Sequence, residues 1–190
     1  YKGVAGEIQV AGQPITQEIN LEASYDTSWY DSTKDSFVIT RGSQLAGLAV
    51  LVNGINSDAL SFEGKTITLA NDISLNEKEC DWLPIGTYEN QFKGNFDGNN
   101  HTISNLLLNR VEDERNIPVL GLFGYISKST LKNITIEGNI NGKTYVGALA
   151  GTSSDSNIEN CTNKADVSAN NSLGGLIGQV YRTNIKNCTN

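Results

Sequence analysis

The sequence predicts an all-β protein, a right-handed parallel β-helix with about 27 residues per coil and a short N-terminal capping helix. Two patterns carry this prediction, because each recurs at one constant interval along the chain. One is a glycine-containing apolar segment, found at 120–124, 147–151 and 174–178. The other is an apolar residue followed two positions later by asparagine, found at 131–135, 158–162 and 185–189. Self-similarity at a fixed interval in this range is typical of stacked repeats.

An interval of about 27 residues fits three strands of about five residues and three corners of about four in every coil. Glycines suit the places where the backbone bends sharply or where layers approach closely. The expected inward positions of two successive coils are Leu149, Ile158, Cys161 and Val167, then Leu176, Ile185 and Cys188.

Asparagine recurs at one expected corner, as Asn133, Asn160 and Asn187. Asparagine tolerates the left-handed backbone conformation that a corner needs, and its amide can bond to the copies above and below. We therefore predict an asparagine ladder along this corner.

A leucine-rich repeat is the main alternative fold, since residues 131–139 match its strand motif and its range of intervals includes the one seen here. The next copy does not fit, because Asn163 stands where a buried leucine is required and Asp166 takes the asparagine position. Leucine-rich repeats do not need the glycine-containing segment, yet in this sequence that segment recurs with fewer changes between copies than the leucine-rich strand motif does. The parallel β-helix is therefore favoured.

The chain divides into extended lead-in strands at 1–28, a loop and capping helix at 29–62, and β-helix repeats at 63–190. Residues 25–38 are polar and are expected to form a loop. Apolar residues at helical spacing predict a helix between 42 and 54, with Thr40 or Ser43 as N-cap and Asn53-Gly54 as its end. Such a helix can cover the open first coil.

The repeat extends loosely back to about residue 63. Gly94 lies one interval before Gly121, and Ile103–Leu106 aligns with Leu131–Ile134 if one extra residue is allowed. Residues 76–92 and 109–118 are expected to be excursions from the coil. Because the chain starts at Tyr1 and stops inside a repeat, we expect it to be truncated at the C-terminus and cut from a longer protein.

The charge balance argues against polyanionic partners. Asp and Glu outnumber Lys and Arg by 21 to 14, and the basic residues are scattered. Nucleic-acid binding and an anionic membrane surface both require basic patches. No apolar run approaches the roughly 20 residues of a membrane span. The sequence therefore predicts neither nucleic-acid binding nor membrane insertion, and it leaves the oligomeric state open.

The three cysteines do not make a disulfide framework. Cys161 and Cys188 take the place that Ile134 holds in the first copy, which indicates small buried apolar residues. Stacked one coil apart, they would be close enough for a disulfide, though parallel side chains hold the Cβ atoms farther apart than a disulfide prefers. Free thiols are favoured over a bridge, and Cys80 has no partner by pattern.

The same motifs carry a family resemblance. Residues 174–178 followed by 185–188 resemble the GLUG motif of bacterial surface proteins, among them the N-terminal regions of IgA1-type metallopeptidases. The stretches 44–53, 65–73, 82–86 and 92–98 are similar to what leads into such motifs, so the resemblance covers about residues 29–190. It implies a right-handed β-helix that is secreted or attached to the bacterial cell surface. It carries no catalytic residues, and the His-Glu-x-x-His signature of the metallopeptidase is absent from the sequence.

Signs of catalytic chemistry are few. His101 is the single histidine and stands beside a turn, and three separated cysteines do not make a zinc site. Asp72, Asp81 and Asp97 are the candidate carboxylates for a glycosidase or lyase face. Turn formation is the favoured reading of Asp72 and Asp97, and Asp97 with Asn99 is too little for a calcium loop. We predict no catalytic residues, no metal site and no cofactor.

Exposed aromatic residues are the remaining candidates for ligand contact, although aromatic residues beside loops more often hold those loops in place. The candidates are Trp82, Tyr88, Tyr145 and Tyr181. The sequence thus favours a non-enzymatic repeat module, a stalk or adhesin-like binding domain with a host or self surface protein or a glycan as partner. The alternative is part of a carbohydrate-active β-helix enzyme, which predicts a groove with two carboxylates and an exposed aromatic ring within about 10 Å.

Overall fold

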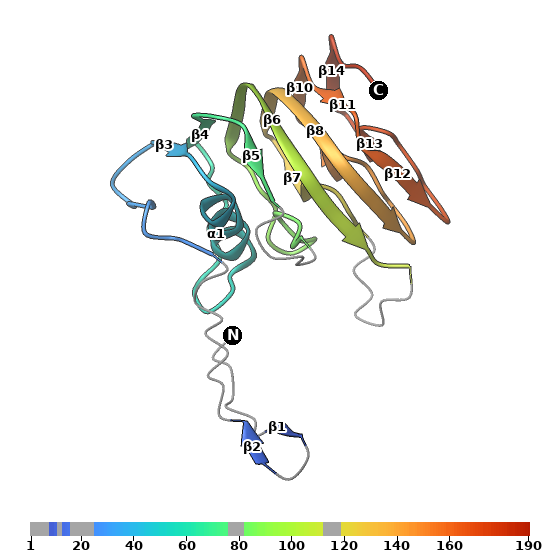
Figure 1. Cartoon of the computed structure of the whole chain (residues 1–190). Helices are drawn as coiled ribbons and strands as arrows, with labels where there is room; N and C mark the ends of the chain where they lie inside the picture. Colours follow the sequence, from blue (N-terminus) through green and yellow to red (C-terminus); the bar gives the residue numbers. More distant parts are fainter. Residues whose placement is uncertain (1–7, 11–12, 16–24, 76–81, 112–118) are drawn as a thin grey trace.

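The computed structural model describes residues 8–10, 13–15, 25–75, 82–111 and 119–190. Within them, parallel strands stack into a β-solenoid (Figure 1), which confirms the predicted fold class. A separate antiparallel pair joins β1 (Ile8–Val10) to β2 (Gln13–Ile15).

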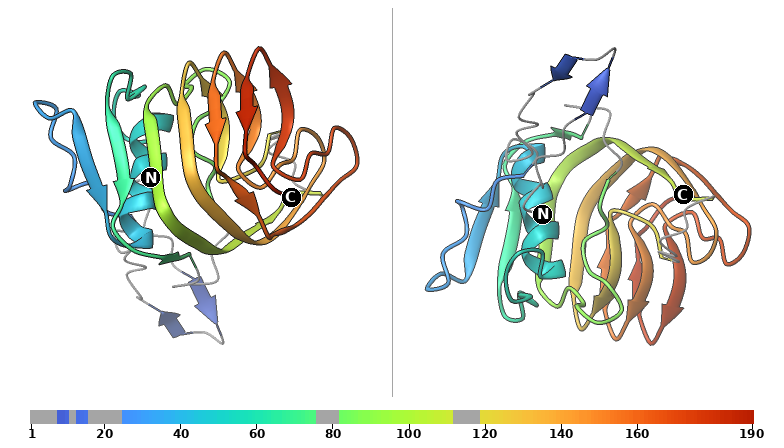
Figure 2. Two further views of the ribbon diagram at one scale, coloured as in Figure 1. Left: turned by 90° about the horizontal axis from the view of Figure 1, so that it is seen from above. Right: turned by 90° about the horizontal axis from the view of Figure 1, so that it is seen from below.

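Two sheets form the walls of the solenoid. In the larger, the strand order is β14-β10-β8-β6-β4-β3, and β5, β11 and β12 pair alongside. Its strands are β3 (Ser36–Ile39), β4 (Thr66–Leu69), β5 (Ile73–Ser74), β6 (Asn95–Asn109), β8 (Thr130–Gly142), β10 (Asn157–Glu159), β11 (Thr162–Asn163), β12 (Asp166–Ala169) and β14 (Asn184–Lys186). The smaller sheet is β7 (Phe123–Ser127), β9 (Ala150–Ser154) and β13 (Ile177–Tyr181). The views in Figure 2 show coils following one another from β3 to β14.

In the C-terminal coils, paired residues of neighbouring strands are separated in the sequence by one repeat interval. Thr130, Asn157 and Asn184 are successive partners, and Ala150 of the smaller sheet pairs with both Phe123 and Ile177. Because these partners are one repeat interval apart, equivalent positions of successive copies stand above one another along the solenoid.

Upstream, residues paired between neighbouring coils are separated in the sequence by more than one repeat interval. The predicted alignment of Ile103–Leu106 with Leu131–Ile134 is therefore wrong. Ile103 pairs with Ile136, and Asn95, which follows Gly94, pairs with Thr130. Gly94 therefore precedes β6 and does not match Gly121. The cause is extra chain: register shifts fall between Asp97 and His101 and between Ile103 and Leu106, and further residues separate β6 from β7. The predicted excursions at 76–92 and 109–118 fall partly outside the described residues.

The corners of the C-terminal coils are built by residues with positive φ. Asn133, Asn160 and Asn187 have φ of 56°, 53° and 54°, which confirms the expected left-handed corner. Lys128, Asp155 and Arg182 repeat this at a second corner, and Tyr145 and Ser172 at a third. Asparagine is well suited to this conformation, whereas it costs bulky side chains free energy.

The core is one continuous apolar column. Phe92, Phe96 and Phe123 are its largest fully buried side chains. Of the predicted inward residues, Leu149, Ile158, Cys161 and Leu176 are buried. Val167 and Cys188 are half-buried, and Ile185 is 45% exposed, because β14 has a described neighbour on one side only.

Helix α1 (Gly42–Asn53) joins the N-terminal end of this core through Leu45, Leu48, Ala49 and Val52. It ends as predicted, with Gly54 in the left-handed conformation and its N–H bonded to the Val50 carbonyl. The predicted N-cap is wrong. Arg41 holds that position, while the N–H and hydroxyl of Thr40 both donate to Gln44 Oε1.

The segment 25–38 is more ordered than expected from its polar composition. Residues 36–38 belong to strand β3, which pairs in parallel with β4. Trp29 and Tyr30 pack their rings edge-on or tilted against Phe37 and Phe62, with ring centroids 5.3–6.2 Å apart. These aromatic contacts hold the segment against the first coil. No helix within the described ranges is long and apolar enough to cross a membrane.

Candidate functional site

The four aromatic residues singled out from the sequence lie in different surroundings. Trp82 is buried, and its indole N–H donates a 2.9 Å hydrogen bond to the Leu122 carbonyl. Tyr181 is exposed on β13, with the Arg182 guanidinium 4.6 Å from its ring centroid. Tyr88 packs its ring against Tyr125, a residue of β7, and Tyr145 raises the pKa of the Tyr125 phenol. One of the four candidates is therefore in ring contact with a further tyrosine, and a second influences that tyrosine electrostatically.

Tyr88 stands on a short turn that several hydrogen bonds hold in place. The Thr87 N–H donates to the Asn90 carbonyl at 2.9 Å, and the Asn90 N–H donates to Thr87 Oγ1 at 3.0 Å. The Asn90 side chain then donates to the carbonyl of Asn53, the last residue of α1, at 3.1 Å. The turn thus carries a fixed backbone, while the Tyr88 side chain is 70% exposed.

Tyr125 begins a column of residues that runs along the solenoid. It lies in register with Thr152 on β9, and Thr152 lies in register with Gln179 on β13. The Tyr88 turn flanks the other side of β7, because Ile85 and Phe92 bridge to Phe123 and Ile126. The rings of Tyr88 and Tyr125 meet edge to face, with centroids 5.7 Å apart and an interplanar angle of 77°.

The glycine-containing segments bring successive coils into close contact beside this column. A Cβ on Gly151 would lie 2.7 Å from Leu120 N and 2.8 Å from the Tyr145 carbonyl oxygen. A Cβ on Gly178 would lie 2.5 Å from Val146 N. No side chain fits at these distances, so glycine is required where the preceding coil crosses the strand.

At the corner of Asn133, Asn160 and Asn187, the predicted asparagine ladder is present. Asn187 Nδ2 donates to Asn160 Oδ1 at 3.2 Å, and Asn160 Nδ2 donates to Asn133 Oδ1 at 3.0 Å. Asn133 in turn donates to the Asp97 carboxylate at 2.9 Å. The ladder confirms the corner prediction and adds an acidic residue at its N-terminal end.

The family model described as "The GLUG motif" matches residues 142–168 and 169–190, two adjacent coils of the solenoid. These coils are GLUG motifs. Searches of curated proteins and of solved structures each returned no match. The GLUG motif is a repeat of extracellular bacterial proteins in general. In this chain the GLUG coils contain the Asn160 and Asn187 corners, the close-contact glycines, and Tyr145.

Tyr145 occupies a corner where the second GLUG coil has serine. Its φ is 49°, equal to that of Ser172 one coil later. A left-handed backbone is uncommon for a bulky residue and costs about 1–2 kcal/mol. The aromatic ring therefore stands at a position where the fold itself accepts a smaller residue.

Several of these residues influence the Tyr125 phenol. Burial raises the pKa of the Tyr125 phenol, the neighbouring Thr152 hydroxyl lowers it, and Tyr145, Tyr88 and Glu89 raise it further. Since the net direction is upward, the Tyr125 hydroxyl stays neutral and remains a hydrogen-bond donor at physiological pH. We call Tyr88, Glu89, Tyr125, Tyr145 and Thr152 the tyrosine face.

Thr152 contributes a polar group at the base of the tyrosine face. Only 9% of the residue is exposed, and its Oγ1 has no hydrogen-bond partner among the described residues. The hydroxyl is near enough to the Tyr125 phenol to lower its pKa, yet without a hydrogen bond of standard geometry. Buried hydroxyls without a partner are rare, and each costs stability.

The candidate carboxylates lie at corners and are held by hydrogen bonds. Asp72 Oδ1 accepts from the Thr102 N–H at 2.9 Å and lies 3.1 Å from His101 Nδ1, and these contacts lower the pKa of Asp72. Burial raises the pKa of Asp97, but hydrogen bonds from Asn133, the Asn99 N–H and Lys132 outweigh it, and the net pKa is lowered. Asp81 and Cys80 lie outside the described residues. A general acid needs a raised pKa, which neither described aspartate has.

Cys161 and Cys188 are free thiols, as favoured from the sequence. They are stacked one coil apart, with the Cys161 N–H 3.5 Å from Cys188 Sγ. Burial raises the pKa of the Cys161 thiol to about 12. The thiol is therefore protonated and unreactive at neutral pH.

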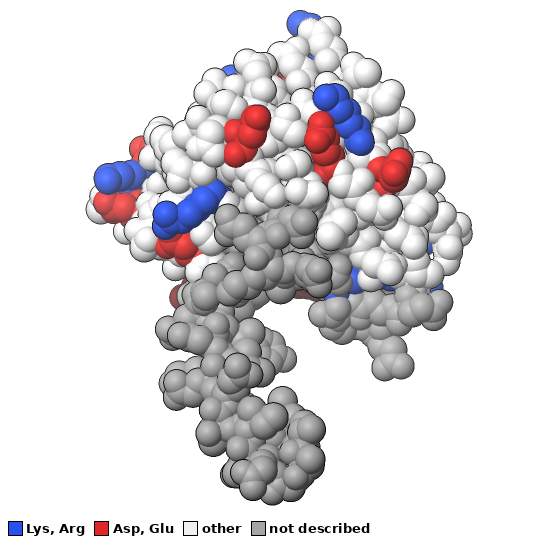
Figure 3. Space-filling view, viewed as in Figure 1, with Lys and Arg blue, Asp and Glu red and all other residues white. Residues whose placement is uncertain are grey.

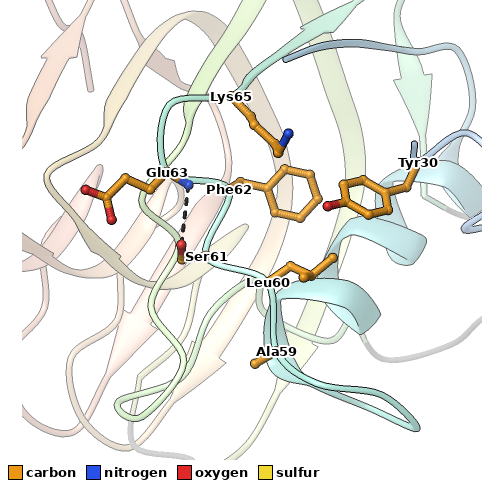
Figure 4. A pocket seen from close by; sticks show the side chains of 7 residues that line it. All are labelled: Tyr30, Ala59, Leu60, Ser61, Phe62, Glu63 and Lys65. Carbon is orange, nitrogen blue, oxygen red and sulfur yellow. Dashed lines mark hydrogen bonds between the residues drawn. The ribbon is translucent and has the colours of Figure 1, made fainter. Parts of the chain in front are cut away.

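A hollow lies near the N-terminal end, with a volume of about 270 Å³ (Figure 4). Its aromatic residues, Tyr30 and Phe62, pack against each other with centroids 5.4 Å apart. The Lys65 ammonium is already bound to the Lys34 carbonyl and lies 3.4 Å from the Asp35 carboxylate. In Figure 4, Glu63 points away from the rings. The residues of this hollow hold the segment 25–38 in place.

Charged side chains are scattered over the face seen in Figure 3, several as acid–base pairs. One such pair within the solenoid is Lys132 with Asp97, at 3.1 Å. In the part of the chain that the structure describes, no group of three or more His, Cys, Asp or Glu side chains is placed to hold a metal ion.

Sequence reasoning missed Tyr125 and Thr152. Neither breaks a visible motif, because both lie beside the apolar glycine segments. A signal was available: Tyr125, Thr152 and Gln179 are spaced at the same interval as the ladder asparagines, but they differ in kind.

Proposed function

We propose that this chain is a non-enzymatic binding module of a larger bacterial protein, secreted or held at the cell surface. The solenoid with its GLUG coils is a repeat module, and GLUG motifs in general belong to extracellular proteins. In this proposal the stacked coils form a rigid support, and one side of that support presents ligand-binding residues.

One observation carries the proposal: the carboxylates most suited to catalysis are used to build the coil. Asp72 binds a backbone N–H and a histidine at one corner, and Asp97 ends the asparagine ladder. Both have lowered pKa values, so both stay ionised at neutral pH. A glycosidase or lyase face would instead need one carboxyl group with a raised pKa, facing a second carboxyl group across a substrate groove.

The proposal is tested by incubating the chain with a panel of neutral and acidic polysaccharides and measuring release of reducing ends. The expected result is no turnover above a blank, together with retention of the chain on one or more of the polysaccharides. Turnover that disappears in an Asp72→Asn, Asp97→Asn double variant would overturn the proposal in favour of an enzyme.

A further inference from the structure

We propose that the tyrosine face binds a neutral polysaccharide of β-linked pyranose units with equatorial hydroxyls, such as a β-glucan. This inference rests on the proposed function, because it names the ligand class of the same module. It commits the module to a glycan rather than to a protein partner.

The rings provide surfaces for stacking. A pyranose with equatorial hydroxyls presents its axial C–H bonds on both faces, and these pack on the electron-rich face of an aromatic ring. Tyr88 meets Tyr125 edge to face at 77°, which holds its ring while the side chain stays 70% exposed to solvent. Tyrosine also adds a hydroxyl, which allows a single residue both to stack and to hydrogen bond.

Hydrogen-bonding groups lie beside those rings. The exposed Glu89 carboxylate makes only a weak contact with Thr87 Oγ1, at 3.4 Å. The Tyr125 phenol remains a neutral donor at physiological pH. Sugar hydroxyls both donate and accept, so a bound glycan can accept from the Tyr125 phenol and donate to the Glu89 carboxylate.

The backbone of the face is strained in one place and pre-ordered in another. Tyr145 keeps an aromatic ring on a left-handed corner that Ser172 fills in the next coil. Such outliers cluster where the strain serves a function. The Tyr88 turn is closed by hydrogen bonds between Thr87 and Asn90. A pre-ordered turn lowers the entropic cost of binding.

The shape and charge of the face select the ligand. Tyr125, Thr152 and Gln179 follow one another along the solenoid axis, one coil at a time, and the Tyr88 ring packs on Tyr125 at the start of this column. Coils are spaced by about 4.8 Å, so a linear sugar chain can lie along several of them. The net charge of −7 and the nearby Glu89 repel uronates and sulfated glycans. A neutral chain is therefore favoured.

The chain itself supplies conservative test variants. Tyr145→Ser and Tyr125→Thr place at these positions the residues that the next coil already uses, Ser172 and Thr152. Tyr181→Ser is the matched control, because Ser154 occupies that place one coil earlier and Tyr181 is not among the residues that contact or influence Tyr125. All three variants remove one tyrosine from a position outside the apolar core.

The experiment is isothermal titration of the full chain with cellohexaose, with polygalacturonate as the acidic comparison. We expect binding to cellohexaose, no binding to polygalacturonate, a rise in Kd of at least about tenfold in Tyr145→Ser and Tyr125→Thr, and no change in Tyr181→Ser. Stacking on an aromatic ring is typically worth this much per contact. Circular dichroism confirms that each variant is folded.

Three results would overturn the inference. They are binding that is unchanged in both tyrosine-face variants, absence of binding to cellohexaose, or tighter binding to polygalacturonate. None of these touches the proposed function, which fails on a different result, the release of reducing ends from the bound glycan.

Discussion

The asparagine ladder and the tyrosine face lie in the same coils but differ in how far their residues repeat from coil to coil. The ladder places the same residue, with similar positive φ, in three successive coils. The column of the tyrosine face changes from Tyr125 to Thr152 to Gln179 over the same distance. The positions that repeat hold the coils together, and our proposal assigns ligand contact to the positions that differ.

The ladder shows how a repeated residue gains from its copies. Each amide donates toward the N-terminal end, and the Asn133 and Asn160 amides also accept from the next coil, so one residue type supplies both halves of the two bonds between asparagines. The series ends on Asp97, whose carboxylate is a stronger acceptor than an amide oxygen. A different residue at the middle position would leave two neighbours without a partner.

The largest expected effect is on the core inside the repeat. Leu149→Ala removes a fully buried side chain of the first GLUG coil and leaves a cavity. We expect the free energy of unfolding to fall by about 2–5 kcal/mol, measured by urea denaturation. Leu107→Ala, at an exposed position, is the control and is expected to change it by less than about 1 kcal/mol. Similar losses of unfolding free energy in the two variants would contradict the difference in burial between Leu149 and Leu107.

The close-contact glycines come next. Gly151→Ala forces a Cβ against Leu120 N and the Tyr145 carbonyl, and we expect a loss of about 1–3 kcal/mol in unfolding free energy. Gly64→Ala provides the comparison, because it has φ of 75° and open space around it. Backbone conformation alone should cost about 1 kcal/mol there. If Gly64→Ala were the more damaging change, close packing would not be the reason for glycine in the motif.

Two substitutions in the middle of the ladder separate backbone conformation from hydrogen bonding. Asn160→Gly keeps the left-handed corner but removes the amide, and it should cost about 1–2 kcal/mol. Asn160→Ala loses the amide and also strains the corner, so it should cost about 1 kcal/mol more. Thermal and urea unfolding of both variants measure the difference. Equal stability of Asn160→Gly and the unchanged chain would show that the ladder contributes nothing.

A smaller effect is expected at low pH. Because the folded pKa of Asp97 lies below its ordinary value of 3.8, the carboxylate stabilises the fold above that pH. This contribution is lost as the pH falls through and below about 4. We expect Asp97→Asn to show a smaller drop in melting temperature than the unchanged chain between about pH 5 and pH 2. An equal or larger drop in Asp97→Asn would rule out this role.

The regular part of the fold could be predicted from the sequence because the interval does not change there. Asn133, Asn160 and Asn187 are evenly spaced, and even spacing in a solenoid means direct stacking. The upstream register could not be predicted, because extra residues around Asn99 and after β6 shift it by amounts that no motif reveals. Strand β3 was hidden by its polar surroundings and forms because β4 pairs with it.

The site was predictable only in part. Tyr88 and Tyr145 stood out as aromatic residues near turns, and both belong to the tyrosine face. Trp82 stood out in the same way, but its indole bonds to Leu122, which is so distant in the chain that no local pattern could show the contact. Tyr125 was missed because its partners are set by coil register rather than by neighbours in the chain.

The most direct test of the central claim is to measure both cellohexaose affinity and unfolding free energy in Tyr145→Ser and Asn160→Gly. Tyr145→Ser should raise Kd by at least about tenfold while stability stays equal or rises, since a strained aromatic corner is relieved. Asn160→Gly should lower stability by about 1–2 kcal/mol and leave Kd unchanged. If the two variants instead lost affinity and stability together, repeated and differing positions would share one role, and the account would be contradicted.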